Sequence, residues 1–241
     1  MPSKTLKQRI HDGEIVVGAV AGIQFERDTF AALLDHGPYD FVSTDSQHSA
    51  YSEERLVAFC EMADEFDIPV QFRIKHTRLA YLTGNCLDLG PSGIEVPQVE
   101  LESTVDDAVE YFYYPPKGNR SWGGGARRGW NSKRERVEYA NWWNESGVLW
   151  MQVESVAAVT QAHRLAKPGV DCLSFGPTDL TFSLESHPKP PFKDVDDCVR
   201  FVAEQLAGSP VAVCHRIGGP ENREKYIDMG VTVLLESVSL P

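Results

Sequence analysis

Polar side chains stand at the ends of two neighbouring apolar runs, where they could hold a metal ion. The run 148–153 carries Gln152 near its end and continues into Glu154, and the run 170–175 is followed by Asp179. Two carboxylates from neighbouring strands repel each other unless one is protonated or a divalent cation lies between them. Taken singly, either carboxylate could instead cap the helix that follows it. Because both donors are oxygen, the pair predicts magnesium or manganese rather than zinc.

Three more polar residues follow other apolar runs of the chain. Asp45 and His48 come at and after the end of the run 39–45, and Arg73 lies at the end of the run 68–74. Taken alone, Arg73 could equally hold a loop in place. A lone histidine such as His48 is more often a hydrogen-bonded polar residue than a catalytic base. The placement of all these groups at successive strand ends favours one shared active site.

Eight short β-rich runs recur along the chain, with candidate amphipathic helices between them. In the segment 52–66, four apolar residues follow helical spacing behind Ser52, which is a plausible N-cap. Strands that alternate with helices imply a parallel sheet with both faces covered. The runs span 15–21, 39–45, 68–74, 93–97, 148–153, 170–175, 210–214 and 231–236.

The number of runs predicts the fold. Eight strand–helix units in one chain of 241 residues fit a single (β/α)8 barrel domain over residues 1–241. A doubly wound open sheet would need fewer strands and usually a glycine-rich phosphate turn, and the sequence contains no GxGxxG or Walker pattern. The glycines 123–125 lie in a long segment between the fourth and fifth runs and are interpreted as a loop. Barrel enzymes place their reacting groups at the carboxyl ends of the strands, so the polar residues above should converge.

Charge and composition narrow the partners and the compartment. A formal net charge of -12 argues against a nucleic-acid backbone or an anionic membrane, because both would repel the protein at long range. The first ten residues contain no apolar signal region, and no later stretch approaches the roughly 20 apolar residues of a membrane span. We therefore expect a cytoplasmic protein with small-molecule substrates. The five cysteines show no CxxC spacing and are expected to be reduced packing residues: Cys60, Cys86, Cys172, Cys198 and Cys214.

Three stretches together resemble the HpcH/HpaI family of metal-dependent pyruvate aldolases. They are "YDFVSTDSQHSAYS" (39–52), "WMQVES" (150–155) and "GVDCLSFGPTDLTFSL" (169–184), and the segment 113–125 is similar to the family's long loop after the fourth helix. The resemblance covers most of the chain from Gly18 onward. It implies a (β/α)8 barrel, assembled as a homo-oligomer (hexamer or trimer), that cleaves or forms 4-hydroxy-2-oxo acids through the enolate of pyruvate.

The resemblance also implies how the substrate is held. Glu154 and Asp179 would bind the metal, either magnesium or manganese with cobalt as an alternative, and this metal would chelate a 2-oxo acid such as pyruvate or oxaloacetate. The second substrate would be an aldehyde. The residues that would hold the pyruvate end are Gln152, Gly176, Pro177 and Thr178.

The catalytic roles follow from the same resemblance. Arg73 would donate to the keto oxygen and stabilise the enolate charge. His48, oriented by Asp45, would take the proton from the 4-hydroxyl through a bound water in the retro-aldol direction. No lysine Schiff base is required, so we interpret Lys75 as a loop or surface charge.

Four departures from the family pattern affect these expectations. Gln47 stands where the family has a glutamate, which should weaken metal binding or alter the metal's water, and Val20 stands where a tryptophan often narrows the aldehyde pocket. In "VCHRIGG", His215 and Arg216 replace an apolar segment; they either bind a substrate carboxylate or face solvent. The chain stops a few residues after the eighth run, so we expect the usual C-terminal eighth helix to be short or missing.

Several functions remain open at this point. The leading prediction is a class II pyruvate aldolase, a carbon–carbon lyase; the alternatives are an oxaloacetate decarboxylase, a macrophomate-synthase-like enolate enzyme, and a catalytically silent ligand-binding barrel. An acyl-CoA lyase is disfavoured because no basic cluster suits the CoA phosphates. Aromatic residues crowd the segment 111–151 and indicate core, a subunit interface or an aromatic aldehyde pocket: Tyr113, Tyr114, Trp122, Trp130, Trp142, Trp143 and Trp150.

Overall fold

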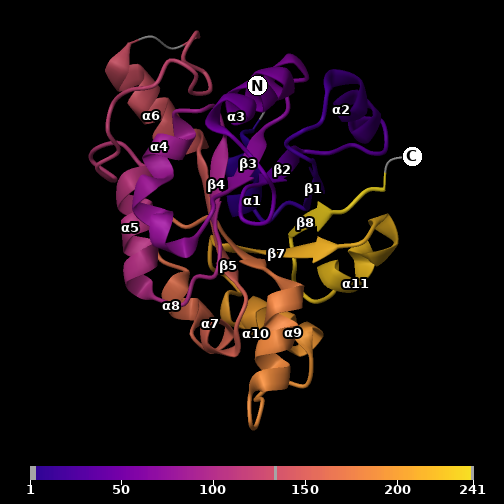
Figure 1. The fold of residues 1–241 in the computed structure, drawn as a ribbon. Coiled ribbons are helices and arrows are strands. Elements are labelled where there is room, and N and C mark those ends of the chain that lie inside the picture. The colour runs from indigo at the N-terminus through magenta and orange to yellow at the C-terminus, as the bar shows by residue number, and fades with distance from the viewer. Residues whose placement is uncertain (1–3, 133–134, 240–241) are drawn as a thin grey trace.

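The computed structural model describes residues 4–132 and 135–239, and its centre is a closed parallel barrel (Figure 1). Neighbouring strands pair in sequence order, and β8 pairs with β1 to close the ring. Each strand overlaps one of the eight predicted runs, which confirms the (β/α)8 barrel. The strands are β1 (Val16–Val20), β2 (Phe41–Asp45), β3 (Val70–Arg73), β4 (Gly93–Val96), β5 (Val148–Val153), β6 (Cys172–Phe175), β7 (Ala212–Ile217) and β8 (Val233–Glu236).

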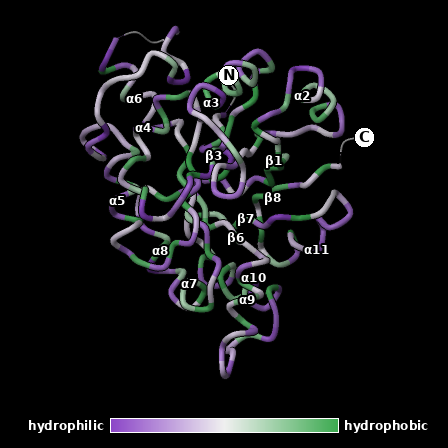
Figure 2. Tube along the Cα trace, in the orientation of Figure 1, coloured by the Kyte–Doolittle hydropathy of each residue, from purple (hydrophilic) through white to green (hydrophobic). Residues whose placement is uncertain are grey.

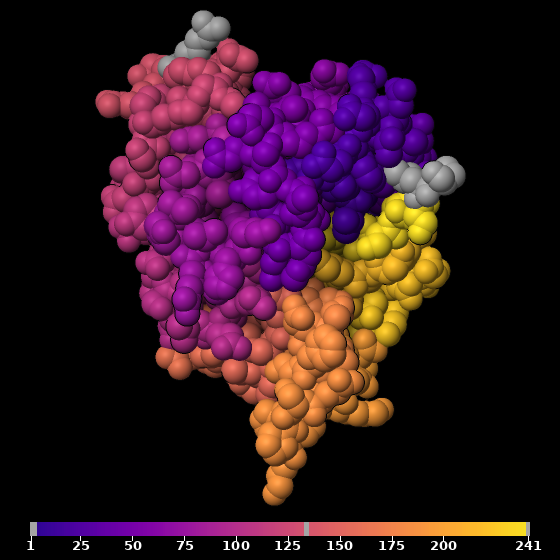
Figure 3. Space-filling model, viewed as in Figure 1, coloured from indigo at the N-terminus to yellow at the C-terminus, as the bar shows by residue number. Residues whose placement is uncertain are grey.

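Helices surround the strands on the outside of the barrel (Figure 1). They are α1 (Leu6–His11), α2 (Arg27–Leu34), α3 (Glu53–Glu65), α4 (Thr83–Leu87), α5 (Glu102–Phe112), α6 (Arg136–Ser146), α7 (Val156–Thr160), α8 (Ala162–Leu165), α9 (Pro177–Ser186), α10 (Val195–Gln205) and α11 (Arg223–Ile227). The two 3-10 helices of the described residues are η1 (Thr77–Leu82) and η2 (Pro220–Asn222). Figure 3 shows the segment around α9, in orange, projecting from the body of the molecule.

Helix α3 shows why these segments form where they do. The side chain of Ser52 accepts a hydrogen bond from the amide of Arg55, which satisfies one of the free donors of the first turn, as predicted. Leu56, Phe59 and Ala63 are spaced by three or four residues and are fully buried against the barrel.

Apolar side chains form two layers, one inside the barrel and one between the strands and the helices. Figure 2 shows the hydrophobic colour gathered on the central strands, while the peripheral loops are mostly hydrophilic. Inside the barrel, Phe41 and Trp150 meet edge to face, with ring centroids 5.4 Å apart. Ile10 and Leu6 of α1 pack on the same inner cluster. Helix α1 therefore closes the end of the barrel where the strands begin.

Several other expectations are tested by the fold. No helix follows β8 within the described residues. The part of the chain that the structure describes contains no helix long and apolar enough to cross a membrane. All five cysteines are free, and four of them are buried.

Candidate active site

Glu154 and Asp179 lie together at the carboxyl ends of the strands, as predicted. Glu154 directly follows β5, and Asp179 lies in the first turn of α9. Both line one cavity of about 290 Å³, together with Thr77, Gln98, Glu100 and Ser155. Glu154 as a residue is 7% exposed, and its Oε2 accepts a hydrogen bond of 2.9 Å from the backbone N–H of Gln98. A single backbone donor therefore holds this buried acid.

The turn from β6 into α9 is shaped to admit that carboxylate. A side chain at Gly176 would place its Cβ 2.1 Å from Oε1 of Glu154, so only glycine fits there. Pro177 follows as the first helical residue, where its missing N–H is not needed. Gly176 offers no side-chain cap, so the backbone N–H groups of Thr178 and Asp179 stay available at the positive end of α9.

Electrostatic repulsion at Glu154 is not compensated by the protein alone. Burial first, and then the charges of Glu95 and Asp179, together raise the pKa of Glu154 to about 7. The Gln98 hydrogen bond and the charge of Arg73 act in the opposite direction and are too weak to prevent the shift. Among the described residues, no group of three or more His, Cys, Asp and Glu side chains is placed to bind a metal. A cation here would have to be held by this carboxylate pair and completed by water or substrate.

Arg73 is fixed by its neighbours at the end of β3. Its Nε donates to Oδ1 of Asp45 over 2.7 Å, and its Nη1 donates to Oε1 of Gln152 over 3.3 Å. The strand register aligns Asp45 with Arg73 and Arg73 with Glu95, so these side chains share the inner face of the barrel. Burial would raise the pKa of Asp45, but the hydrogen bond and charge of Arg73 hold it below its ordinary value. Asp45 is therefore an ionised anchor for the guanidinium group.

His48 lies near Asp45, but the predicted contact with its ring is not made. Oδ2 of Asp45 accepts the backbone N–H of His48 over 3.0 Å, and Oδ1 accepts the backbone N–H of Gln47 over 2.9 Å. This is the usual way in which an aspartate stabilises the turn that follows it. The imidazole is exposed and has no hydrogen-bond partner among the described residues. Asp45 therefore places the backbone of His48 and leaves the ring free to turn.

Gln152 carries an unused donor beside Arg73. Its side chain is fully buried, and its Nε2 has no hydrogen-bond partner within the described part of the chain. A buried amide donor without a partner is unfavourable, so it marks a place where a ligand oxygen would bind.

Three polar residues beneath the site were not predicted together. Glu95 of β4 is fully buried, and its Oε2 accepts a 2.6 Å hydrogen bond from Nη2 of Arg216 on β7. Ser174 of β6 donates to Oε1 of Glu95 over 2.6 Å and accepts from Nη1 of Arg216 over 2.8 Å. Burial alone would raise the pKa of Glu95, but the charge and the hydrogen bond of Arg216 hold it below its ordinary value. A glutamate inside the apolar run 93–97 was the available signal, because such a group requires a partner.

The structure separates His215 from Arg216. Strand β7 continues to Ile217, so the two side chains point to opposite faces of the barrel wall. Arg216 points inward, whereas His215 is 2% exposed and packs on Tyr226 of α11, with ring centroids 4.1 Å apart. Burial lowers the pKa of His215 to about 4, so it is neutral at physiological pH. His215 is a packing residue and faces neither the site nor solvent.

The remaining candidates lie at the edges of the site or away from it. Val20 ends β1 with 38% exposure, Gln47 is half-buried, and Lys75 is exposed. The aromatic residues do not act as one group, because Trp150 lies inside the barrel while most of the others pack around Arg120 and Arg127. None of the predicted aromatic residues lines the cavity of Glu154.

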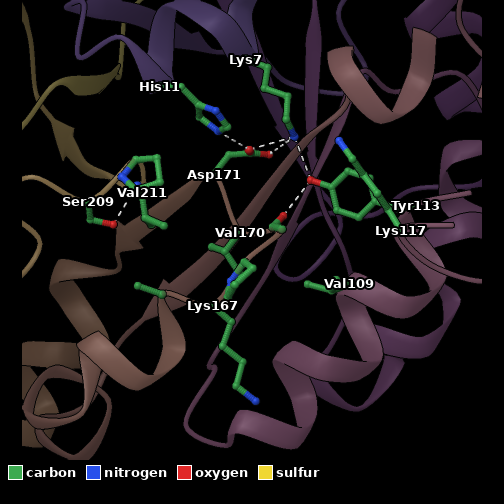
Figure 4. Close-up of a pocket in the computed structure, with 14 residues that line it drawn as sticks. Lys7, His11, Val109, Tyr113, Lys117, Lys167, Val170, Asp171, Ser209 and Val211 are labelled. Atoms are coloured by element: carbon green, nitrogen blue, oxygen red, sulfur yellow. Dashed lines mark hydrogen bonds and ion pairs between the residues drawn. The ribbon is translucent and has the colours of Figure 1, made fainter. Parts of the chain in front are cut away.

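A larger cavity lies at the other end of the barrel. Its volume is about 500 Å³, and it is lined by residues of α1 and α5 and by the loops that precede β6 and β7 (Figure 4). In it, Lys7 donates to the hydroxyl of Tyr113 and to Asp171, and His11 lies 2.7 Å from the same carboxylate. None of the predicted site residues belongs to this cavity. Its polar groups already pair with one another and join α1 to the barrel.

Known proteins are similar to this chain in sequence and in fold. A family model described as HpcH/HpaI aldolase/citrate lyase matches residues 28–219. A hydroxypyruvate/pyruvate aldolase of Paraburkholderia phytofirmans is 30% identical over 191 residues, which cover 74% of this chain and 70% of the relative. Another, of Pseudomonas aeruginosa, is 24% identical over 95% of this chain and 85% of its own length.

Solved structures show the same fold. The crystal structure of an HpcH/HpaI aldolase from Desulfitobacterium hafniense is similar with a TM-score of 0.85 and 24% identity, covering 98% of this chain and 90% of its own. Macrophomate synthase is similar with a TM-score of 0.78 and 20% identity, over 97% of this chain and 83% of its own.

Proposed function

The chain belongs to the HpcH/HpaI aldolase/citrate lyase family, and we propose that it is a divalent-metal-dependent class II pyruvate aldolase. In this role it cleaves or forms a 4-hydroxy-2-oxo acid, with pyruvate and an aldehyde as the smaller partners. The observation that carries the proposal is the uncompensated pair of Glu154 and Asp179 beside Arg73 and the free amide of Gln152.

The charges at the site fit a divalent cation. When all groups are ionised, four carboxylates face two guanidinium groups, so two negative charges remain unbalanced: the groups are Asp45, Glu95, Glu154, Asp179, Arg73 and Arg216. Glu154 and Asp179 supply only oxygen donors, which magnesium, manganese and cobalt accept. When bound, such an ion would supply Lewis-acid polarisation of the keto group of the oxo acid.

The side chains of this chain bind and orient the oxo acid. The amide Nε2 of Gln152 donates to a substrate oxygen and so gains the partner that it lacks. The N–H groups at the start of α9, after Gly176 and Pro177, bind the substrate carboxylate at the positive end of the helix. Thr178 is exposed at this helix end and can add its hydroxyl.

Arg73 and His48 act on the charge and the proton. The guanidinium group of Arg73, held by Asp45, donates to the keto oxygen, where negative charge develops as the enolate forms. The imidazole of His48 takes the proton of the 4-hydroxyl through a water molecule in the cleavage direction. Its exposed ring can reach this position because its own hydrogen bonds do not restrain it.

Oxaloacetate decarboxylation tests this assignment, because it needs the enolate site and no particular aldehyde. Metal-stripped protein should be inactive and should regain activity with magnesium or manganese. Glu154→Gln, an isosteric change at the carboxylate pair, should abolish that recovery. Glu185→Gln, at an exposed position of the same helix as Asp179, should leave it intact. Equal recovery in wild type and Glu154→Gln would refute the assigned site.

The proposal includes the setting of the enzyme. We infer a cytoplasmic homo-oligomer, either a hexamer or a trimer. Leu101 and Phe182 are each 64% exposed, which supports contact between copies of the chain. Light scattering coupled to size exclusion would give the mass, and a monomer at micromolar concentration would remove this part of the proposal.

A further inference from the structure

We propose that the cavity at the end of the barrel where the strands begin is a second binding site, for a monocarboxylate with an apolar body. Its volume is about 500 Å³, and it shares no residue with the cavity of Glu154 and Asp179 at the opposite end. The inference goes beyond the proposed aldolase function and does not depend on it. Its basis is the size of the cavity, its surplus of positive charge and its apolar wall.

The size and the walls of the cavity suit a small molecule. Cavities of about 300–1,000 Å³ are typical of small-molecule sites. Asp171 and Val211 directly precede β6 and β7, and Lys7 comes from α1, so the walls belong to packed elements from distant parts of the chain. The hydroxyl of Tyr113 accepts from Nζ of Lys7 over 2.8 Å and donates to the carbonyl of Gly169 over 2.7 Å. These bonds hold the polar wall in place without a ligand.

Positive charge exceeds negative charge in this cavity. Nζ of Lys7 lies 4.9 Å and Nζ of Lys117 lies 5.9 Å from the ring centroid of Tyr113, so two ammonium groups approach the same ring. Burial, followed by the charge of Asp171, raises the pKa of Tyr113 well above its ordinary value, so its hydroxyl stays neutral. Asp171 is the only carboxylate among the described lining residues, and it is already paired with Lys7 and His11.

The other two lysines of the lining have partners that lie outside the cavity. Lys117 pairs with Glu145 over 2.7 Å, and Lys167 pairs with Asp106 over 2.6 Å. The side chains of Glu145 and Asp106 are 71% and 63% exposed, so water competes for both pairs and they contribute little to stability. An anion inside the cavity can therefore compete for either ammonium group, although the whole protein carries a net charge of -12.

The apolar wall shows that the ligand is more than a simple anion. Figure 4 shows the bonded network of Lys7, His11 and Asp171 on one side of the cavity, and Val109 and Val170 on another. An inorganic anion would leave this wall in contact with water, whereas an apolar body would cover it. One carboxylate with an apolar body therefore matches both sides. The apolar lining residues are Val109, Ala166, Pro168, Val170, Pro210 and Val211.

The test compares three probes by calorimetry with metal-free protein. 3-Phenylpropanoate carries both the charge and the apolar body, 3-phenylpropanamide keeps the body without the charge, and acetate keeps the charge without the body. Wild type should bind 3-phenylpropanoate with a Kd at least about tenfold lower than that of either other probe. Equal affinity for all three probes, or no binding of 3-phenylpropanoate at millimolar concentration, would overturn the proposal.

Two variants address the two sides of the cavity. Lys117→Gln removes one ammonium group and should raise the Kd of 3-phenylpropanoate about tenfold. Because its ion pair is exposed, this variant should fold normally. Ala166→Phe adds a ring to the apolar wall and should raise the same Kd by a similar factor, with all charges kept. An unchanged Kd in Lys117→Gln would refute the assigned charge.

Lys225→Gln is the matched control. The side chain of Lys225 is 48% exposed, as is that of Lys117, and each ammonium group lies 2.7 Å from one carboxylate. Lys225 belongs to α11 and does not line the cavity. This variant should keep the Kd of wild type. A rise in Kd equal to that of Lys117→Gln would show that the general charge of the protein, and not this cavity, holds the probe.

Arg73→Lys separates this site from the proposed active site, which also binds carboxylates. Binding of 3-phenylpropanoate should be unchanged in Arg73→Lys and in wild type saturated with manganese and pyruvate. Binding that is lost in Arg73→Lys and kept in Lys117→Gln would place the probe in the active site and overturn the proposal. Failure of oxaloacetate decarboxylation would refute the aldolase function alone, because the calorimetric result requires no turnover.

Discussion

The amide of Gln152 is buried without an acceptor, and this arrangement favours ligand binding over stability. Replacement by leucine removes the unsatisfied donor, so Gln152→Leu should raise the free energy of unfolding by about 1 kcal/mol. It should also lower kcat/KM for the oxo acid by about tenfold. Urea unfolding and steady-state kinetics measure the two effects.

Gln71 provides the control for this prediction. Its Nε2 is likewise buried without a partner among the described residues, but it lies deeper in the barrel on β3. Gln71→Leu should change stability in the same direction and leave kcat/KM unchanged. A loss of activity in both variants would mean that general repacking of the barrel interior, and not substrate binding, explains the Gln152 result.

The raised pKa of Glu154 predicts a particular pH dependence of stability. Its ordinary value is 4.5, and burial followed by the charges of Glu95 and Asp179 raises it to about 7. Between these values the unfolded chain has released a proton that the folded chain keeps. The free energy of unfolding must therefore fall as pH rises through this window, by on the order of 3 kcal/mol in total.

The comparison needs metal-free protein at about pH 5 and about pH 7.5, with Glu154→Gln as the reference for all other titrating groups. Wild type should lose more stability than Glu154→Gln over this interval. Added manganese should stabilise wild type most at the higher pH, because it binds the ionised carboxylate. The same pH dependence in both proteins would show that Glu154 is already ionised at about pH 5.

Residue types at strand ends were sufficient to find the acidic pair, Arg73 and Gln152, because the barrel brings all strand ends to one place. They were not sufficient to assign the contact between Asp45 and His48. A sequence shows that the two are three residues apart, and at that spacing an aspartate can bind either a backbone N–H or a ring. The partner of Glu95 could not be predicted either, because Arg216 lies 121 positions away.

At the scale of single elements, β7 shows where sequence patterns mislead. The predicted run ended at Cys214 because His215 and Arg216 are polar, yet the strand continues to Ile217. Both side chains are accommodated by tertiary contacts that come from other elements, namely α11 for His215 and β4 for Arg216. The pattern of apolar residues locates a strand well where the strand packs against apolar neighbours. It fails where the strand carries buried polar residues that contact other elements of the fold.

A buried lysine adds polar contacts between helix α1 and the barrel to the packing of Ile10 and Leu6. Nζ of Lys7 donates to Tyr113, to the carbonyl of Gly147 and to Asp171, and Asp171 is 1% exposed. Lys7→Met would leave Asp171 with His11 alone as a charged partner. We expect a loss of about 3 kcal/mol, or about 6–12 °C in Tm for a chain of this size.

Lys4→Met is the control at the start of the same helix. Lys4 also pairs with two carboxylates, Asp12 and Glu14, but all three side chains are exposed to solvent. Ion pairs exposed to solvent contribute little to stability because water screens them, so Tm should change by at most a few degrees. Equal shifts in both variants, measured by calorimetry, would show that α1 does not depend on the buried network.

At the scale of the whole molecule, closure of the ring makes every strand depend on two others. β8 pairs with β1 on one side and β7 on the other, so it joins segments almost 200 residues apart in the sequence. Trp150 lies inside this ring, while other tryptophans lie near α6. Unfolding in urea followed by tryptophan fluorescence and by far-ultraviolet circular dichroism should therefore give one coincident transition.

Removal of residues 231–241 tests the same dependence directly. The deletion takes away β8, exposes the pairing edges of β1 and β7, and opens the inner cluster that Val233 and Leu235 help to fill. Because no strand of an opened ring keeps its core covered, we expect loss of the cooperative transition in the whole chain and not merely in its C-terminal part. A truncated protein that still unfolds cooperatively, with the fluorescence of Trp150 unchanged, would show that the first seven strands form an independent unit and that closure is not what holds the site together.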